Sequence, residues 1–509
     1  MSIPRRNLLG ILLTFVTGIA LLLIATLQTS SAQSEEEDST YEYVGLPESY
    51  FVSADTINEW IEAEDIESMR AHAWNLWSGL TADTPYVNSN GVVIPVWDTW
   101  YTPYDVFTVG PNAADDIGSA HEFNDFAQLS GVHTGASTSN VDLLGFNKFN
   151  QQYADHIWEN NYYTADGLLD VMNSCEPDTI CAIQPFTNDA VSMKPVFIPI
   201  SSSGITIVPV WRGVFPINTS EDPSTSWLDY STAGVGSSTW LQCVAIDMTG
   251  TYAPGTVIDN ITSTTDTTDQ LLVSCNQATV VSVDDFYHIP VTANDLNFNG
   301  QPNQTINQLN MDTLRVESKA VADGDEAIFV ASHVTTREIP NWVWFTVWWS
   351  PNPNTGTQIA IEYPTTQDAI ADGAMYDNYP GGGEDRPADI AAPWNNYTIC
   401  TNYQYVSPLQ GDDAPRNPDL TPEFCFNPYL EAGFSQNDVG PMGGINTNCM
   451  ACHGNANWNG HNITPSLGYT SAMYIPRNDP QFDGLLQLDF AWSISGNVNP
   501  PTPEATEAP

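Results

Sequence analysis

One short run near the C-terminal end of the chain constrains the fold more than any other feature. It reads Cys449-Met450-Ala451-Cys452-His453, within the stretch NTNCMACHGNANW. In a Cys-x-x-Cys-His run the two thiols can bond to the vinyl groups of a haem, and the adjacent imidazole can ligate its iron. A chain of this composition would contain the pattern by chance roughly 0.002 times. The run therefore predicts one covalent haem c, attached at Cys449 and Cys452, with His453 as the proximal iron ligand.

Two other uses of a Cys-x-x-Cys pair are half of a zinc site and a redox disulfide. A zinc site needs a second pair of ligands at finger spacing, and the sequence contains none. A thioredoxin-like redox pair needs no histidine after it and normally lies in a cytosolic βαβ unit. Haem attachment is the use that the whole motif favours.

The place of the motif in the chain limits what can surround the haem. About 43 residues lie between His453 and the Pro/Glu/Thr tail at 497–509. A small class I cytochrome c has its motif near the N-terminus and needs a longer segment after it for a helical core and a methionine ligand. We therefore expect a haem attachment segment at 441–496, packed on one large integrated body at 46–440, and not a stand-alone class I cytochrome c.

The second axial position on the iron has three candidates, Met473, His461 and His333. A methionine ligand raises the reduction potential, a second histidine lowers it, and an open position admits small ligands. The sequence leaves these alternatives open.

The N-terminus has the pattern of an export signal. Arg5 and Arg6 precede an apolar stretch at 8–27, and small residues lead to Ala32. This order is typical of a secretory signal peptide that is cleaved after Ala32. An apolar run of about 20 residues can also span a bilayer, so an uncleaved N-terminal anchor is the alternative for residues 1–32. Both predict an extracytoplasmic location, in the periplasm, at the cell surface or secreted.

The charge balance limits the partners. The chain has 61 acidic residues against 12 lysines and arginines, a formal net charge of −49. Such a chain repels nucleic acid and anionic lipid, so neither is expected as a partner, and the membrane is reached only through the N-terminal anchor. An acidic surface suits a basic redox partner protein or simple solubility.

Six cysteines remain besides the haem pair. An even number in an oxidising compartment predicts disulfides, and neighbours in sequence are the simplest pairing. The expected bridges are Cys175–Cys181, Cys243–Cys275 and Cys400–Cys425.

Local patterns predict an α+β, β-rich fold with its helices near the N-terminus. A capping box at Thr56 and Glu59 begins a helix at 56–80, and two more helices are expected at 143–159 and 164–172. Residues 33–45 and 497–509 read as a disordered acidic leader and a disordered tail, and 351–441 as long loops. Strands are expected at 91–100, 240–248, 271–283, 327–335 and 343–349, with a hairpin formed by 196–200 and 205–211.

Several blocks of the chain resemble large secreted bacterial proteins of the cytochrome c family. The block at the motif, 442–458, is joined by HVTTREIPNWVWFTVWW at 333–349 and LLQLDFAWSI at 485–494. Further similar blocks lie at 95–107, 143–157, 194–213 and 284–293. The resemblance implies a single covalent haem at Cys449, Cys452 and His453 within one integrated body, and it implies no substrate or partner.

These patterns together predict an exported monohaem c-type cytochrome that transfers single electrons. The body is large for one haem, which leaves two alternatives. One is a c-haem-dependent oxidoreductase, peroxidase-like or acting on a small substrate, with an open sixth iron position. The other is a haem-based sensor or surface-binding protein.

Overall fold

The computed structural model describes most of the chain after residue 40. Contacts divide the chain into two compact units, Met1–Tyr41 and Glu42–Pro509, and the elements below belong to the second. The predictions for residues 1–32, His461, Met473 and Cys425 fall outside the described residues. No helix within the described part is long and apolar enough to cross a membrane. The described residues are 41–63, 65–115, 123, 144–177, 179–210, 243–262, 274–297, 321–351, 375–376, 386–403, 406–407, 421–424, 427–431, 449–460 and 476–498.

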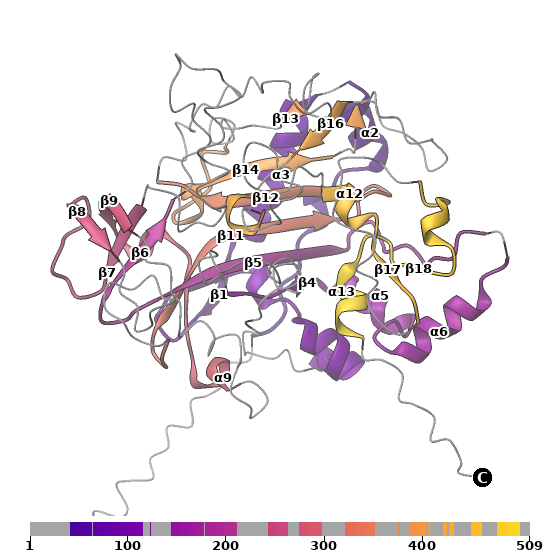
Figure 1. Ribbon diagram of the computed structural model, residues 1–509, viewed down its shortest axis with the longest axis horizontal. Coiled ribbons are helices and arrows are strands. Elements are labelled where there is room, and N and C mark those ends of the chain that lie inside the picture. The colour runs from indigo at the N-terminus through magenta and orange to yellow at the C-terminus, as the bar shows by residue number, and fades with distance from the viewer. Residues whose placement is uncertain are drawn as a thin grey trace, which may run out of the picture. The chain divides into compact units, whose positions relative to one another are not determined.

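A seven-stranded antiparallel sheet forms the centre of this unit. Its path runs β14-β12-β11-β5-β3, while β10 pairs with β11 and β4 with β5 (Figure 1). The strands predicted at 327–335 and 343–349 form as β11 and β12, which are rich in β-branched and aromatic residues and lie in the interior of the sheet. The strands are β3 Leu144–Gly145, β4 Lys148–Phe149, β5 Val191–Ile200, β10 His288–Pro290, β11 Glu326–Thr336, β12 Val343–Trp349 and β14 Tyr397–Asn402.

Four smaller sheets complete the strands of the described residues. One has the order β6-β7-β9-β8, one β13-β16-β15, and two are the pairs β1-β2 and β17-β18. Their bounds are β1 Asp83–Val87, β2 Val93–Pro95, β6 Ile205–Pro209, β7 Cys243–Asp247, β8 Val257–Thr262, β9 Ser274–Val281, β13 Met375–Tyr376, β15 Val406–Ser407, β16 Thr421–Phe424, β17 Asn457–Trp458 and β18 Leu486–Gln487.

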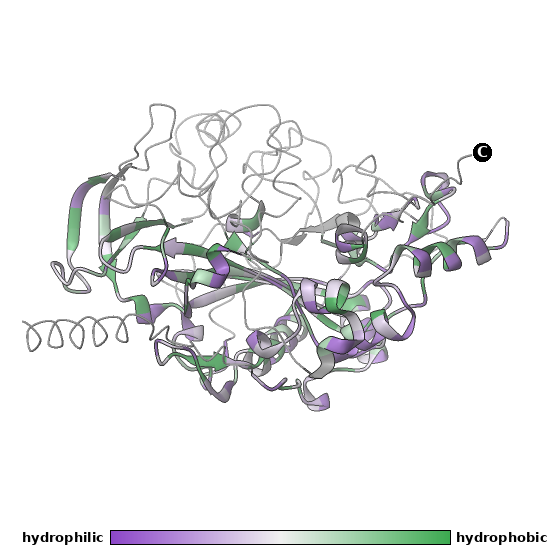
Figure 2. Ribbon diagram, turned by 90° about the horizontal axis from the view of Figure 1, so that it is seen from below, coloured by the Kyte–Doolittle hydropathy of each residue, from purple (hydrophilic) through white to green (hydrophobic). Residues whose placement is uncertain are grey.

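Helices and single turns lie around these sheets. The α-helices are α2 Ala54–Glu62, α3 Ile66–Leu80, α5 Gln151–Glu159, α6 Ala165–Ser174, α9 Ala293–Leu296, α11 Pro428–Glu431, α12 Cys449–His453 and α13 Trp492–Asn497. Shorter or irregular turns are η1 Glu48–Tyr50, η2 Val96–Thr99, η3 Tyr104–Val109, η4 Gly110–Asp115, η6 Val283–Asp285, η8 Trp394–Asn396 and η10 Pro480–Phe482. Helices at the edge of the unit, α6 among them, carry hydrophilic and hydrophobic residues side by side (Figure 2). This mixture of helices and multi-stranded sheets confirms the predicted α+β, β-rich fold.

The strand register sorts the side chains of the central sheet onto two faces. Residues directly opposite each other on neighbouring strands share a face, and the face alternates along each strand. Lys194 of β5 lies opposite His333 of β11, which lies opposite Thr346 of β12. Two residues from Thr346, Trp344 lies opposite Asn402 of β14. We call the face that carries these five residues the site face.

The opposite face packs against α3, and we call it the helix face. A register shift between Phe329 and Ala331 turns Phe329 toward the same side as Phe197. Trp77 of α3 then lies 6.1 Å from Phe329 and 5.9 Å from Tyr397, measured between ring centroids. Trp77 is completely buried, so this face is filled by aromatic packing.

Several predicted elements are wrong in their bounds or pairing. The single helix at 56–80 is two helices, because Ser53 caps α2 and Asp65 caps a separate α3. The strand at 91–100 is only β2, followed by the turn η2. The helix at 143–159 begins at Gln151, after β3 and β4.

The predicted hairpin does not form. β5 pairs with β11, β3 and β4, whereas β6 pairs with β7 in the four-stranded sheet. The strands are adjacent in sequence but their apolar residues are buried in different sheets. The loops expected at 351–441 also contain β13, β14, β15, β16 and α11.

The two ends of the body extend further than the sequence suggests. Tyr43 and Val44, assigned to the acidic leader at 33–45, pack on the core: the Tyr43 hydroxyl accepts from the Gln151 amide at 3.0 Å, and the Val44 carbonyl accepts from the Trp100 indole at 2.9 Å. At the other end, Asn497 is the last residue of α13, so the described fold overlaps the first residue of the predicted tail.

Candidate haem attachment site

The Cys-x-x-Cys-His run forms α12, a single turn of helix. Residues three and four apart lie on the same side of a helix, so Cys449 shares a side with positions 452 and 453. Met450, between them in sequence, is completely buried in a hydrophobic cluster, whereas Cys449 and His453 are only partly buried. The helix is thus anchored through Met450, and Cys449 packs at the edge of the same cluster.

A five-residue helix is too short to be stable without tertiary support. Asn402, the buried last residue of β14, supplies it: its side-chain oxygen accepts a hydrogen bond from the Cys449 amide at 3.1 Å. This amide is one of those left without a partner in the first turn of a helix. The end of the central sheet therefore caps α12 at Cys449, the first residue of the motif. Cys449 is not in a disulfide in this structure.

The His453 ring is fixed by one backbone carbonyl. Its Nδ1 lies 2.9 Å from the Phe490 carbonyl oxygen. A carbonyl can only accept, so Nδ1 carries the hydrogen and Nε2 carries the lone pair of the neutral ring. Histidine ligands of metals commonly donate their other ring nitrogen in this way, which fixes the tautomer and the ring orientation. The ring is prepared to ligate through Nε2.

The environment also keeps this ring neutral. Burial lowers the pKa of His453 to about 3, the hydrogen bond to the Phe490 carbonyl acts in the opposite direction, and Lys194 and His333 lower the pKa further. The His453 residue retains some accessible surface, but the protein packed around its ring is dense enough for desolvation to have the largest effect on the pKa. A metal ligand must be deprotonated, so His453 is in the ligating form at neutral pH.

Trp344 connects α12 to the site face of the sheet. Its ring centroid lies 4.2 Å from that of His453, at an interplanar angle of 45°. The indole nitrogen donates to the Asn341 carbonyl at 3.0 Å, which holds the ring in place. Trp344 and Asn402 are opposite each other on β12 and β14, so one cross-strand pair supports both ends of the helix.

A small β-ladder brings Phe490 to His453. After α12, Ala456 donates to the His453 carbonyl at 2.9 Å, and β17 then pairs with β18. Leu488, just after β18, donates back to the Ala456 carbonyl at 3.0 Å. Figure 1 shows α12, β17, β18 and α13 grouped beside the end of the central sheet. The ladder places residue 490 next to residue 453 across 37 positions of sequence.

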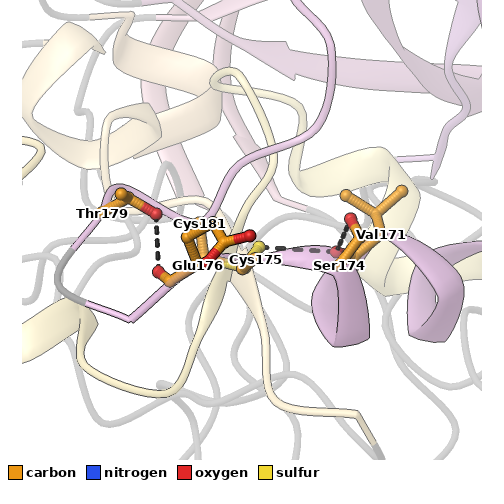
Figure 3. The surroundings of a disulfide bond; sticks show 6 residues. All are labelled: Val171, Ser174, Cys175, Glu176, Thr179 and Cys181. Carbon is orange, nitrogen blue, oxygen red and sulfur yellow. Dashed lines mark hydrogen bonds between the residues drawn. A yellow bond between two sulfur atoms is a disulfide. The ribbon is translucent and has the colours of Figure 1, made fainter.

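The Cys175–Cys181 disulfide supports the same ladder and confirms one of the three predicted bridges (Figure 3). It joins the C-terminal end of α6 to a segment that bonds to β18. The Gln487 amide donates to the Cys181 carbonyl at 2.9 Å. The Gln487 carbonyl accepts from the Ile183 amide at 3.0 Å. Cys243 and Cys400 are also disulfide-bonded, and the pairings proposed for them involve side chains outside the described set.

Of the three candidate sixth ligands, the structure describes only His333. It lies on the site face, between Lys194 and Thr346, and it lowers the pKa of His453. Three other described histidines lie within hydrogen-bond distance of identified groups elsewhere in the body. His72 Nδ1 lies 2.8 Å from the Tyr403 hydroxyl, His156 Nε2 3.0 Å from the Gln184 carbonyl, and His288 Nδ1 2.7 Å from Glu326.

A bound haem and a metal ion held by protein alone require different sets of donor residues. No group of three or more His, Cys, Asp or Glu side chains able to hold a metal occurs among the described residues. A covalent haem brings four ligands of its own and needs one imidazole with a fixed tautomer, which His453 provides. The sequence predicted Cys449, Cys452 and His453 as attachment residues, and the structure adds Asn402 and the Phe490 carbonyl as their neighbours. Sequence reasoning missed these two because no local pattern marks a cap or an acceptor supplied by a distant part of the chain.

Comparison of the chain with protein-family models, with curated proteins and with solved structures found no match to any of the three.

Proposed function

We propose that the protein is an exported monohaem c-type cytochrome that transfers single electrons. The observation that carries the proposal is the hydrogen bond from His453 Nδ1 to the Phe490 carbonyl, within a one-turn Cys-x-x-Cys-His helix. A structural Cys-x-x-Cys pair would not require a neutral, oriented imidazole at the next position.

Each residue has a distinct part in the proposal. Cys449 and Cys452 hold the haem through thioether bonds, and His453 ligates its iron through Nε2. A bound haem c supplies one-electron chemistry by cycling between ferrous and ferric iron. Trp344 packs against the ligand ring and, with Asn402, keeps α12 on the sheet. The Cys175–Cys181 disulfide and the N-terminal signal pattern support an oxidising, extracytoplasmic compartment.

For the second axial ligand we propose His333 ahead of Met473 and His461. It is on the same sheet face as Trp344, and its register partner Thr346 is two residues from Trp344. Diagonal neighbours of this kind on adjacent strands lie within about 7–8 Å of each other. Two histidine ligands would give a low reduction potential.

The primary test is a pyridine haemochrome spectrum of protein matured with a c-haem assembly system. A c-type band with one haem per chain is expected, and its absence would reject the proposal. The alternative function, a haem oxidoreductase with an open sixth position, is separated by ligand titration. A low-spin iron that does not respond to cyanide or carbon monoxide supports electron transfer, whereas ready binding of either ligand supports the oxidoreductase.

A further inference from the structure

The carbonyl that fixes His453 belongs to an unusual turn. Ala491 donates to the Leu488 carbonyl at 2.8 Å, which closes a four-residue β-turn. Its two central residues, Asp489 and Phe490, have φ angles of 45° and 70°. Positive φ at both central positions is the mark of a type I′ turn, in which Asn-Gly and Asp-Gly are strongly preferred. Phe490 occupies the position where glycine is expected.

This conformation is costly for a residue with a large side chain. A non-glycine residue in the left-handed region costs of the order of 1–3 kcal/mol and persists only when its surroundings fix it. The structure shows what fixes it. One oxygen of the Asp489 carboxylate, Oδ2, accepts from the Phe186 amide and from Arg337 Nε, both at 3.0 Å.

The ion pair is well placed to hold the turn. Asp489 and Arg337 are both 7% exposed, so water does not compete strongly for their bonds. Arg337 is itself tied to the body, since its amide donates to the Ala190 carbonyl at 3.0 Å. Breaking a buried pair by changing one partner is strongly destabilising, because the other charge is left without compensation.

We propose that Asp489 and Arg337 are positioning residues for the proximal ligand. Their buried ion pair holds Asp489 and Phe490 at positive φ. The Phe490 carbonyl can then keep the hydrogen on His453 Nδ1 and orient the ring. This inference rests on the proposed haem function for its consequence, but the positioning itself is a property of the protein alone. A carbonyl bond to Nδ1 increases the basicity of the ligating nitrogen and thereby favours ferric iron.

The first experiment replaces the ion-pair carboxylate in the haem-loaded full chain. Asp489→Asn keeps the size of the side chain and an oxygen for the Phe186 amide, but it removes the charge. We expect the ratio of ferrous to ferric protein at a fixed potential to rise about tenfold, a positive shift of about 59 mV for a one-electron couple. The measurement is a spectroelectrochemical titration, with the exposed Asp483→Asn as the matched control.

Loss of a negative charge near the iron would raise the potential without any change in geometry, so a second variant separates the two causes. Asp489→Asn with Phe490→Gly creates Asn-Gly, the preferred type I′ sequence, and has the same charge as Asp489→Asn alone. We expect it to recover most of the wild-type potential. Failure to recover would overturn the positioning role and assign the shift to charge.

A third readout does not need the haem. In apoprotein with Cys449 and Cys452 changed to alanine, nitrogen-15 NMR of His453 should show the Nδ1–H tautomer. Asp489→Asn is expected to mix the tautomers, and Phe490→Gly to restore a single one. Unchanged tautomers in Asp489→Asn would overturn the proposal even if a haem is bound, whereas a colourless wild type with the expected tautomers would reject only the haem function.

Should Asp489→Asn fail to fold, the double variant Asp489→Asn with Arg337→Met tests the same idea. It removes both charges, and replacing a buried ion pair by neutral groups is often tolerated. It should therefore mix the tautomers, and a single Nδ1–H tautomer in this variant would overturn the proposal.

Discussion

The two faces of the central sheet are built from the same strands but differ in what they carry. The helix face is filled by packed aromatic rings, among them Trp77, Phe329 and Tyr397. The site face carries Lys194, His333, Thr346 and Asn402 beside the large rings of Trp344 and Trp348. One of the three lysines of this very acidic chain lies there.

Because side chains alternate between the two faces of a strand, the same strand can pack the core with one face and support α12 with the other. The apolar positions of β12 and β14 are buried against α3 and hold the sheet together. On the opposite face, Asn402 caps α12, Lys194 and His333 lower the pKa of His453, and Trp344 contacts its ring. Substitutions on the two faces should therefore have different consequences.

The largest expected effect comes from changing both thiols of α12, Cys449→Ala with Cys452→Ala. Without thioether bonds the c-type haemochrome band should disappear completely, because nothing else attaches the haem covalently. Far-UV circular dichroism should stay close to that of the wild type, since the helix face is untouched. A variant that retains covalent haem would contradict the assignment of the site.

Trp77→Ala on the helix face should affect stability instead. Truncating a fully buried tryptophan costs about 3–5 kcal/mol, because the lost contacts leave a cavity. The free energy of unfolding, measured with denaturant, should fall by this amount, while the haem spectrum of the folded fraction stays the same. Trp77→Phe, which keeps an aromatic ring, serves as the milder control. A change in the haem spectrum would show that the two faces are coupled.

A smaller effect is expected from Asn402→Ala on the site face. It removes the acceptor of the Cys449 amide, and loss of a helix cap costs about 1 kcal/mol. Hydrogen exchange should speed up in α12 and leave β12 protected. Thr398→Ala, on the same strand and face but away from α12, is the control, and equal effects of the two would argue against a specific cap.

The smallest effect concerns pH and His156, which lies 4.3 Å from Phe186 between ring centroids. Burial lowers its pKa, and the Gln184 carbonyl acts in the opposite direction. The unfolded chain, with a pKa of about 6.5 at this residue, therefore binds the proton first as the pH falls, and the native state loses stability below about pH 6.5.

In His156→Gln this contribution is absent. The free energy of unfolding of the wild type should fall relative to that of the variant between about pH 7.5 and pH 5.5. Urea titrations at the two values measure the difference. A gap that does not change with pH would mean that His156 is not held neutral.

Sequence patterns predicted part of this fold well. β11 and β12 were recognisable because β-branched and aromatic residues are concentrated in them, and α6 because Thr164 caps it. The hairpin of β5 and β6 was predicted wrongly, since local spacing cannot show that each strand is buried in a different sheet. The break between α2 and α3 was missed because the apolar spacing continues across it, although Asp65 is a suitable cap.

The sequence by itself determined the Cys-x-x-Cys-His motif, whose two thiols and imidazole at fixed spacing are the basis of the proposed haem attachment. It also determined the negative net charge and the α+β class, which follow from composition and periodicity. Only the tertiary structure decided which carbonyl accepts from His453, which side chain caps α12 and why Phe490 can be left-handed. These depend on contacts between residues 37, 47 and 152 positions apart, which are set by strand pairing and burial and leave no local pattern in the chain.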